Sequence, residues 1–350
     1  MSDSTPLKVG HFQTLDLSAD DEVIIQDQLY GSHTVSEPVL NDLLRSPALA
    51  RLIGVHQHGI SAFLNFTPPI TRFEHSVGAL LLVRLVGGGL EEQVAALLHD
   101  VSHTVLSHVV DFALAEPGEG SFHEVHKMRY VGTTHIPDIL AAHGFGDLRP
   151  LDEALYPLVE RPAPRLCADR LDYGLRDAVG FGHLSLADAR RVVASLGAFP
   201  DAAAPDRLLV LRDREAALGL ARAYAACDRD VWGSPAHGDL YLRTAQLMRA
   251  AIRGGGGVPE EELWRLSDEE FWSRMREVLD DAGREAMKRL ESEGLPDDKD
   301  LPLPRGAKIR TIDPDVYDAA SDKAVPLSVV YPEYGREREQ YLIARRALYS

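Results

Sequence analysis

The stretch between Arg72 and Asp111 constrains the fold of this chain most strongly. Apolar residues recur at helical spacing from residue 72 to residue 86, three glycines at 87–89 end that pattern, and residues 90–98 begin a second apolar helix. This second helix ends at an adjacent imidazole and carboxylate, His99 and Asp100. The sequence therefore predicts two helices that place a polar pair at the border of the core.

The polar residues that follow this pair keep a helical spacing. At about 100° per residue they would lie within one half of an unbroken helix, with apolar residues in the other half. The polar set consists of His99, Asp100, His103, His108 and Asp111. We expect a helix with one side toward a polar site, bent near Ser102 where the periodicity is imperfect.

A neutral imidazole and a carboxylate can hold one divalent metal ion from two sides. Two ligands rarely suffice, and the sequence offers two more, His75 upstream and Asp169 downstream. Six of the 14 histidines fall between residues 75 and 126, which favours a common site. The alternative for Asp169 is a simple ion pair with Arg170 or Arg176.

This ordered set resembles the HD superfamily of metal-dependent phosphohydrolases, whose signature is His…His-Asp…Asp. The resemblance spans residues 22–255, and within the superfamily the sequence is similar to the deoxynucleotide triphosphohydrolase branch. The matching segments are Asp27-Gln28-Leu29-Tyr30-Gly31 followed by Pro38-Val39-Leu40, Gln57-His58-Gly59, Thr71 to Gly78, His99 to Asp111, and Asp169 to Asp177. The resemblance implies that His75, His99, Asp100 and Asp169 are metal ligands, and the metal is Mn, Fe, Zn, Ni, Co or Mg.

The resemblance also implies a set of catalytic residues beside the metal. His108, oriented by Asp111, would protonate the leaving group, and the alternative for both His103 and His108 is a core or supporting histidine. His103 would act in catalysis or join a second metal. His123 and Glu124 match a His-Glu pair near the phosphates and the attacking water.

Substrate contacts follow from the same likeness. Gln57 and Arg72 match substrate-binding positions, with an ion pair from Arg72 to Glu74 or Asp169 as the rival role. The sugar contacts would be Tyr173 and Asp177, although a tyrosine on a helix face usually serves packing. His58 differs from the branch, which generally has leucine at this position near the sugar. We therefore expect this difference to affect sugar preference.

Composition narrows the remaining function classes. The chain has 350 residues, of which 45% are hydrophobic, and a formal net charge of −17. That charge argues against stable nucleic-acid or anionic-membrane binding, and no apolar run approaches the length of a membrane span. Two cysteines and a polar N-terminus fit a cytoplasmic protein. We expect the partner to be a small phosphorylated substrate, a nucleotide. The resemblance allows a homo-oligomer.

These observations predict a mainly α-helical fold, an HD-domain bundle with additional C-terminal helices and room for a small β element. We expect a flexible N-terminus at 1–21, the HD domain at 22–255, and a helical or β extension at 256–350 after a glycine hinge at 254–257. Residues 53–66 would form a loop or hairpin, and residues 207–212 a strand or part of a hairpin. A long helical region at 214–252 would break at 233–235.

The expected function is that of an enzyme, a metal-dependent phosphohydrolase. It would hydrolyse a phosphoester or phosphoanhydride of a nucleotide, a (deoxy)nucleoside triphosphate or monophosphate. Two alternatives stay open: a binuclear-iron HD oxygenase that uses His103 or His108, and a catalytically silent nucleotide-sensing HD protein.

Overall fold

A computed structural model describes residues 7–116, 118, 120–254, 257–298, 301–302 and 308–348. The fold is mixed, with a large helical core and two four-stranded sheets. The prediction of a mainly α-helical fold is therefore wrong. Its error has a physical reason, because strands of three to five residues are too short for their period of two to stand out in a sequence.

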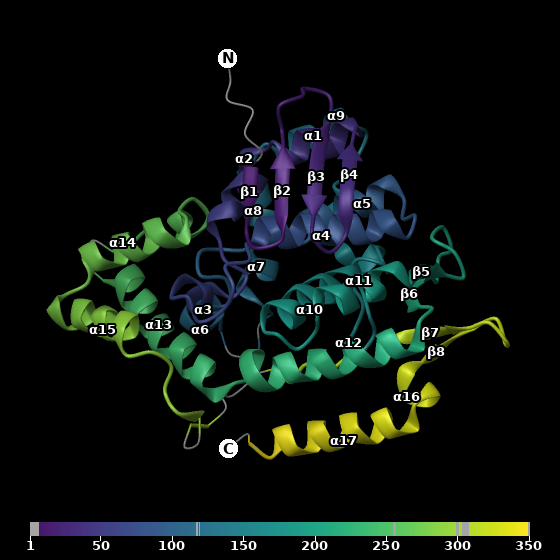
Figure 1. Cartoon of the computed structure of the whole chain (residues 1–350). Helices are drawn as coiled ribbons and strands as arrows, with labels where there is room; N and C mark the ends of the chain where they lie inside the picture. The colour runs from purple at the N-terminus through teal and green to yellow at the C-terminus, as the bar shows by residue number, and fades with distance from the viewer. Residues whose placement is uncertain are drawn as a thin grey trace.

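The first sheet is an antiparallel meander near the N-terminus (Figure 1), in the order β1-β2-β3-β4. Its strands are β1 (Leu7–Val9), β2 (Gln13–Asp16), β3 (Val23–Asp27) and β4 (Gly31–Val35). Leu15 pairs with Ile25, and both side chains are fully buried. The expected flexible N-terminus is thus wrong from residue 7 onward, because Leu15 and its neighbours fill the core; residues 1–6 lie outside the described residues.

Short and medium helices form the body of the molecule behind this sheet (Figure 1). They are α1 (Pro38–Leu44), α2 (Pro47–Ala50), η1 (Arg51–Gly54), α3 (Gly59–Phe63), α4 (Arg72–Leu85), α5 (Leu90–Leu98), α6 (Val109–Leu114), α7 (Phe122–Val125), α8 (Lys127–Val131), α9 (Ile136–Ala142), η2 (Arg149–Leu151) and η3 (Glu153–Leu155). The region expected to be a loop or hairpin at 53–66 contains the short helix α3 instead. Helix α4 packs against both α5 and α10, so it occupies the centre of the core.

The helix expected to run through His99 to Asp111 is interrupted. Helix α5 ends at Leu98 and α6 begins at Val109, and between them Leu106 and Ser107 have φ angles of +54° and +48°. Distant residues hold this irregular backbone, because Leu106 N–H donates to Asp268 Oδ1 (2.7 Å) and Val105 N–H donates to the Leu263 carbonyl (3.0 Å). The periodicity could not reveal a break that contacts from so far along the chain impose.

The second half of the helical core lies across the site from α4 (Figure 1). Its elements are α10 (Ala168–Gly180), α11 (Leu186–Ala194), α12 (Arg214–Cys227), the π-helical turn η4 (Asp228–Trp232) and α13 (Pro235–Arg253). The predicted break at 233–235 is confirmed, and the strand predicted at 207–212 is β6. The second sheet contains β5 (Leu196–Phe199), β6 (Leu208–Leu211), β7 (Asp315–Asp318) and β8 (Lys323–Pro326).

The C-terminal region packs back onto the core. Its elements are η5 (Glu260–Trp264), α14 (Asp268–Val278), α15 (Asp281–Ser292), α16 (Leu327–Val330) and α17 (Pro332–Arg346). Strand β7 pairs in parallel with β6, so the regions at 22–255 and 256–350 share one sheet. Residues 255 and 256 of the expected hinge lie outside the described residues.

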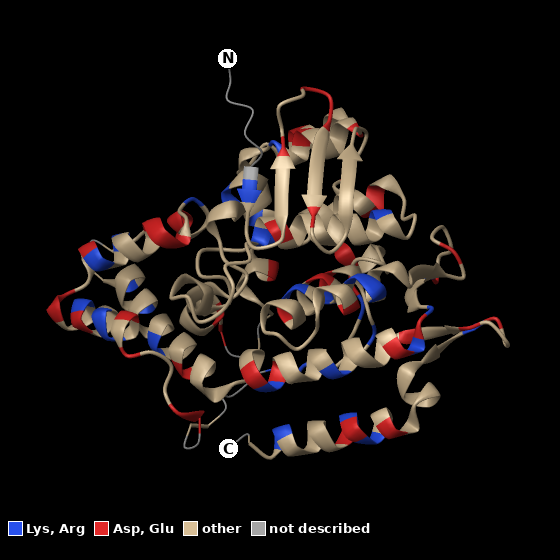
Figure 2. Ribbon diagram, in the orientation of Figure 1, with Lys and Arg blue, Asp and Glu red and all other residues tan. Residues whose placement is uncertain are grey.

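Charged residues of both signs alternate along the outer helices α12 and α17 (Figure 2). Some of them join neighbouring elements: Arg222 on α12 forms a two-bond ion pair with Glu337 on α17. In the part of the chain that the structure describes, no helix combines the length and apolar character needed to cross a membrane.

Candidate metal centre

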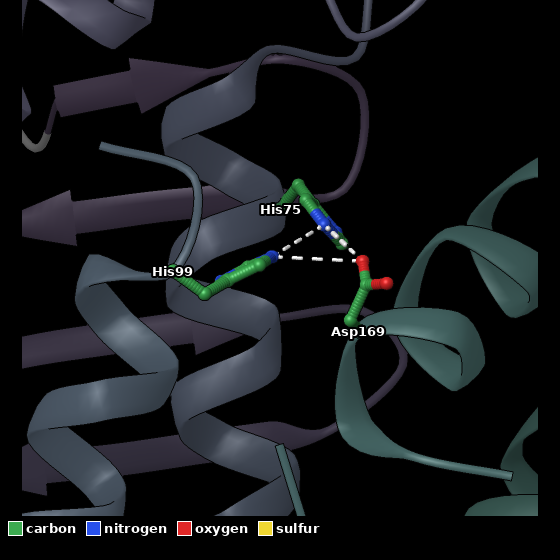
Figure 3. Close-up of side chains that lie close together, drawn as sticks. All are labelled: His75, His99 and Asp169. Carbon is green, nitrogen blue, oxygen red and sulfur yellow. Dashed lines mark hydrogen bonds and ion pairs between the residues drawn. The ribbon is translucent and has the colours of Figure 1, made fainter. Parts of the chain in front are cut away.

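Three side chains from three helices converge on one point (Figure 3). His75 lies one turn into α4, His99 caps the C-terminus of α5, and Asp169 lies in the first turn of α10. The two Nε2 atoms are 3.1 Å apart, and Asp169 Oδ1 lies 3.0 Å from His75 Nε2 and 3.5 Å from His99 Nε2. Both imidazoles are buried.

The outer nitrogens of the two imidazoles define their tautomers. His75 Nδ1 is 2.7 Å from Asp172 Oδ2, and His99 Nδ1 is 2.7 Å from the Ala96 carbonyl. Because both partners are acceptors, each Nδ1 carries a proton, so each ring in its neutral form turns its Nε2 lone pair toward the other. Two lone pairs and a carboxylate at this distance fit a cation between them, so the donor set suits a divalent metal ion.

Electrostatics favour positive charge at the same point. Burial by itself would lower the pKa of His75, but the carboxylates of Asp169 and Asp172 outweigh it and raise this pKa to about 10. A site that stabilises an added proton so strongly also stabilises a metal ion.

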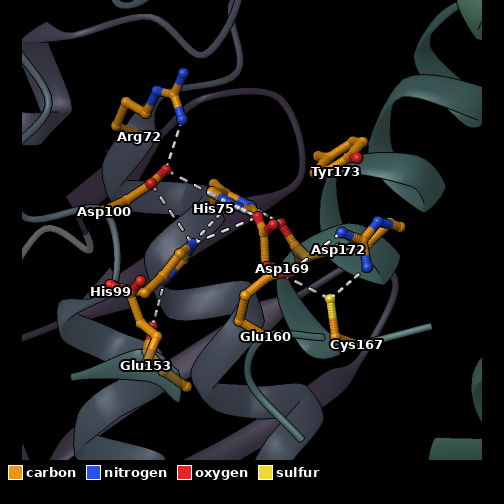
Figure 4. Close-up of polar contacts among 12 residues, drawn as sticks. Arg72, His75, His99, Asp100, Glu153, Glu160, Cys167, Asp169, Asp172 and Tyr173 are labelled. Atoms are coloured by element: carbon orange, nitrogen blue, oxygen red, sulfur yellow. Dashed lines mark hydrogen bonds and ion pairs between the residues drawn. The ribbon is translucent and has the colours of Figure 1, made fainter. Parts of the chain in front are cut away.

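Asp100 borders this cluster rather than lying at its centre (Figure 4). Its Oδ2 lies 3.6 Å from His75 Nε2, and its Oδ1 lies 3.8 Å from His99 Nε2 and 3.3 Å from His103 Nε2. Asp100 also groups with His103 and His123 in a second set of donors close enough to share one ion. The four predicted ligands are therefore neighbours, and Asp100 lies between two possible ion positions.

Arg72 fixes the Asp100 carboxylate. Its Nη1 donates to Asp100 Oδ2 (2.5 Å), its Nε to Ser107 Oγ (3.0 Å) and its Nη2 to the Gln57 carbonyl (3.3 Å). The ion pair expected as a rival role for Arg72 thus exists, with Asp100 rather than with Glu74 or Asp169. All of its nitrogens already have protein acceptors.

A buried network behind His75 was missed by the sequence reasoning. Asp172 accepts hydrogen bonds from the Tyr30 hydroxyl (2.7 Å) and from Arg176 Nε (2.9 Å), in addition to that from His75. Arg176 is fully buried and also bonds Glu74 and Asp27, which link it to the first sheet. Its members lie in segments that resemble the family, but no pattern in the sequence showed that they contact one another.

Gly78 on α4 makes room for this network. A Cβ at that position would lie 1.8 Å from Asp172 Oδ1 and 2.6 Å from Arg176 Nη2. Only glycine lets the carboxylate and guanidinium approach the α4 backbone so closely.

Three further histidines form a row beside Asp100. The rings of His103 and His123 stack at 3.5 Å between centroids, and His108 lies edge-on to both. His108 Nδ1 bonds Asp111 Oδ2 (2.9 Å), as the expected acid and its orienting partner would. Burial would raise the pKa of Asp111, but the bond from His108 and other donors lower it to about 2, so Asp111 is ionised.

The pKa of His108 itself is lowered. Desolvation by the surrounding protein is the main cause, and it outweighs the hydrogen bond to Asp111. A bound anionic phosphate would oppose this shift, because a nearby negative charge stabilises the imidazolium.

The other predicted site residues are divided between the interior near the metal centre and the surface. His58 Nε2 and Trp232 Nε1 each bond one oxygen of the buried Asp177 carboxylate (both 2.8 Å), so both of its oxygens have partners. The ring of Tyr173 lies 6.2 Å from that of His75, and the side-chain oxygen of Gln57 is buried with no partner among the described residues.

Glu124 is exposed and joins none of the donor clusters found among the described residues. The helix α7 turns its neighbour His123 inward and Glu124 outward.

Two known proteins are similar to this chain over nearly its whole length. No protein-family model matches the sequence. The metal-dependent phosphohydrolase cns2 of Cordyceps militaris is 54% identical over 342 residues, which cover 98% of this chain and 99% of that protein. The uncharacterised protein YdhJ of Bacillus subtilis is 33% identical over 332 residues, which cover 93% of this chain and 98% of that protein. A phosphohydrolase structure from Bacteroides thetaiotaomicron has a TM-score of 0.64 at 18% identity, covers 87% of this chain and 94% of its own, and shows a shared fold.

The chain belongs to the metal-dependent phosphohydrolases. It is accordingly a hydrolase that uses a metal cofactor, and the clusters of histidine and aspartate described above are the groups able to hold one.

Proposed function

We propose that this hydrolase is of the HD type and cleaves a phosphoester or phosphoanhydride of a nucleotide, a (deoxy)nucleoside triphosphate or monophosphate. The observation that carries the proposal is the convergence of the His75 and His99 Nε2 atoms with the Asp169 carboxylate. Asp100 completes the ligand set from its place beside both rings. This mixture of imidazole and carboxylate ligands accepts Mn, Fe, Zn, Ni, Co or Mg.

A divalent ion held by these residues would supply an activated water molecule and neutralise charge on a phosphate. The protein side chains divide the remaining work. His108, kept in orientation by the ionised Asp111, gives its proton to the leaving oxygen. The ring of His123 stacks on that of His103, and we expect His123 to orient the attacking water. The exposed Glu124 is too far outside the cluster to share that task in this conformation.

A second ion is a specific extension of this proposal. Asp100, His103 and His123 offer three buried donor atoms within reach of one ion. Nδ1 of His103 is buried without a partner among the described residues. Membership of a hydrolase family favours hydrolysis at such a pair of ions over iron-dependent oxygenation, and the complete donor set favours an active enzyme over a silent sensor.

The proposal is tested with metal-stripped protein and a panel of nucleoside mono- and triphosphates, to which Mn, Co, Ni, Mg, Zn and Fe(II) are added in turn. Both inorganic phosphate and triphosphate are measured. Triphosphate release from a deoxynucleotide would support the triphosphohydrolase branch, and inorganic phosphate from a monophosphate would support a nucleotidase. No turnover of any nucleotide with any metal, from protein that hydrolyses a non-nucleotide phosphoester, would refute the nucleotide substrate.

Asp100→Asn serves as the inactive control. The amide keeps an acceptor for Arg72 but removes the ligand charge, so we expect a folded protein without turnover. Wild-type activity in this variant would refute the assignment of Asp100.

A further inference from the structure

The segment that follows residue 308 lies against the wall of the candidate site. Arg310 N–H donates to Asp228 Oδ1 (2.9 Å), and the Tyr341 hydroxyl donates to Asp228 Oδ2 (2.8 Å). One residue further on, Thr311 accepts a hydrogen bond from Arg338 (3.0 Å). These bonds from η4 and α17 fix the backbone at residue 310.

The part of the molecule that receives this segment also contacts residues of the candidate site. Asp228 begins the turn η4, and Trp232 at the end of that turn bonds Asp177. One helical turn before Asp228, Tyr224 makes a hydroxyl–hydroxyl hydrogen bond to Tyr173, the residue beside His75. The backbone of Arg310 is therefore anchored next to the helix that carries Tyr224, which contacts Tyr173 of the site.

The guanidinium of Arg310 differs from those of the other arginines near the site. Arg72 bonds Asp100, Arg170 bonds Glu160, and Arg176 bonds three carboxylates. Arg310 is half-buried, and its side chain has no hydrogen bond or ion pair with any residue that the structure describes.

The charge of Arg310 reaches the interior of the site. It adds to the desolvation that lowers the pKa of His108, and it opposes the burial that raises the pKa of Tyr173 and Tyr241. These residues belong to three elements: the start of α6, α10 and α13. The positive charge of Arg310 is therefore close enough to act on residues from all three elements.

We propose that Arg310 is a phosphate-binding residue, which the C-terminal region supplies to the active site. Its planar fork would bind oxygens of the substrate phosphate from the side of His108, while the metal ligands hold the opposite side. This role would add to the one expected for Arg72, whose nitrogens all have protein acceptors. The inference rests on the proposed phosphohydrolase site and adds a substrate contact to it.

The test compares Arg310→Ala with Arg310→Lys and Lys308→Ala. Lys308 is an exposed residue of the same segment, so its removal deletes the same charge without touching the pocket. Each variant is assayed with the substrate that the wild type turns over, with inorganic phosphate as a competitive inhibitor, and by the rise in Tm that inorganic phosphate causes in metal-loaded protein.

For Arg310→Ala we expect KM and the inhibition constant of phosphate to rise about tenfold or more, which is the size of one charge-assisted hydrogen bond. The Tm rise caused by phosphate should shrink, while bound metal per chain and the Tm without phosphate stay unchanged. Arg310→Lys should fall between alanine and wild type, and Lys308→Ala should match the wild type.

Wild-type KM and phosphate affinity in Arg310→Ala would overturn the inference, as would an equal loss in Lys308→Ala. The failure of the proposed function is a separate outcome. If Asp100→Asn keeps its activity, the metal site is wrong; if Asp100→Asn is inactive while Arg310→Ala binds phosphate normally, only the role of Arg310 is wrong.

Discussion

Replacement of Asp172 by asparagine tests how the protein holds His75. Asp172 accepts the Nδ1 proton of His75 at 2.7 Å, and both side chains are completely buried. The substitution keeps the shape of the side chain but removes the charge that fixes the ring and strengthens its Nε2 as a ligand. Arg176 retains Glu74 and Asp27 as partners, so the fold should persist.

The size of the effect follows from this geometry. Loss of such a supporting partner usually weakens metal affinity about 10- to 100-fold, or roughly 1.4 to 2.7 kcal/mol. We expect a value within that range for Asp172→Asn, because the hydrogen bond is short, charge-assisted and shielded from water. The Tyr30 hydroxyl and Arg176 still hold one oxygen position, which should prevent a larger loss.

The assay is titration calorimetry of stripped protein with Mn²⁺, with Asp20→Asn as control. Asp20 is exposed in a loop and makes no hydrogen bond or ion pair among the described residues, so its variant should bind metal like the wild type. Unchanged metal affinity in Asp172→Asn, or the same loss in both variants, would refute the reasoning.

Two other predictions concern catalysis and specificity. Asp111→Asn removes a carboxylate that opposes the lowering of the His108 pKa, so that pKa should fall further. In a pH–rate profile, the decline of kcat/KM at high pH should then begin at a lower pH. If the decline of kcat/KM at high pH did not move, His108 paired with Asp111 would be excluded as the general acid. His58→Leu removes one of the two bonds to Asp177 and should change the deoxy-to-ribo ratio of kcat/KM about tenfold without altering metal affinity. Equal ratios in variant and wild type would show that His58 does not set sugar preference.

The sequence was sufficient to find the residues that meet at the centre. His75, His99 and Asp169 each lie at or near a helix terminus, and a family resemblance identified them before any contact was known. Their roles as ligands remain a prediction, but the structure brings them within hydrogen-bonding distance of one another.

What the sequence could not reveal depends on contacts between distant parts of the chain. The helix expected beyond His99 is broken because Asp268 and Leu263 bond the backbone at Leu106 and Val105. Arg310 has no motif around it, and only the docking of its segment on Asp228 brings it to the site. The first sheet was overlooked because its strands are short, although it anchors Arg176 through Asp27.

The most direct test of the central claim is the number of divalent ions bound per chain in the wild type and in Asp169→Asn, measured by elemental analysis after equilibration with Mn²⁺ and removal of free metal. Circular dichroism would verify that both proteins are folded. The account predicts at least one tightly bound ion in the wild type and one fewer in the variant, with loss of hydrolysis. The same ion content in both proteins would contradict it.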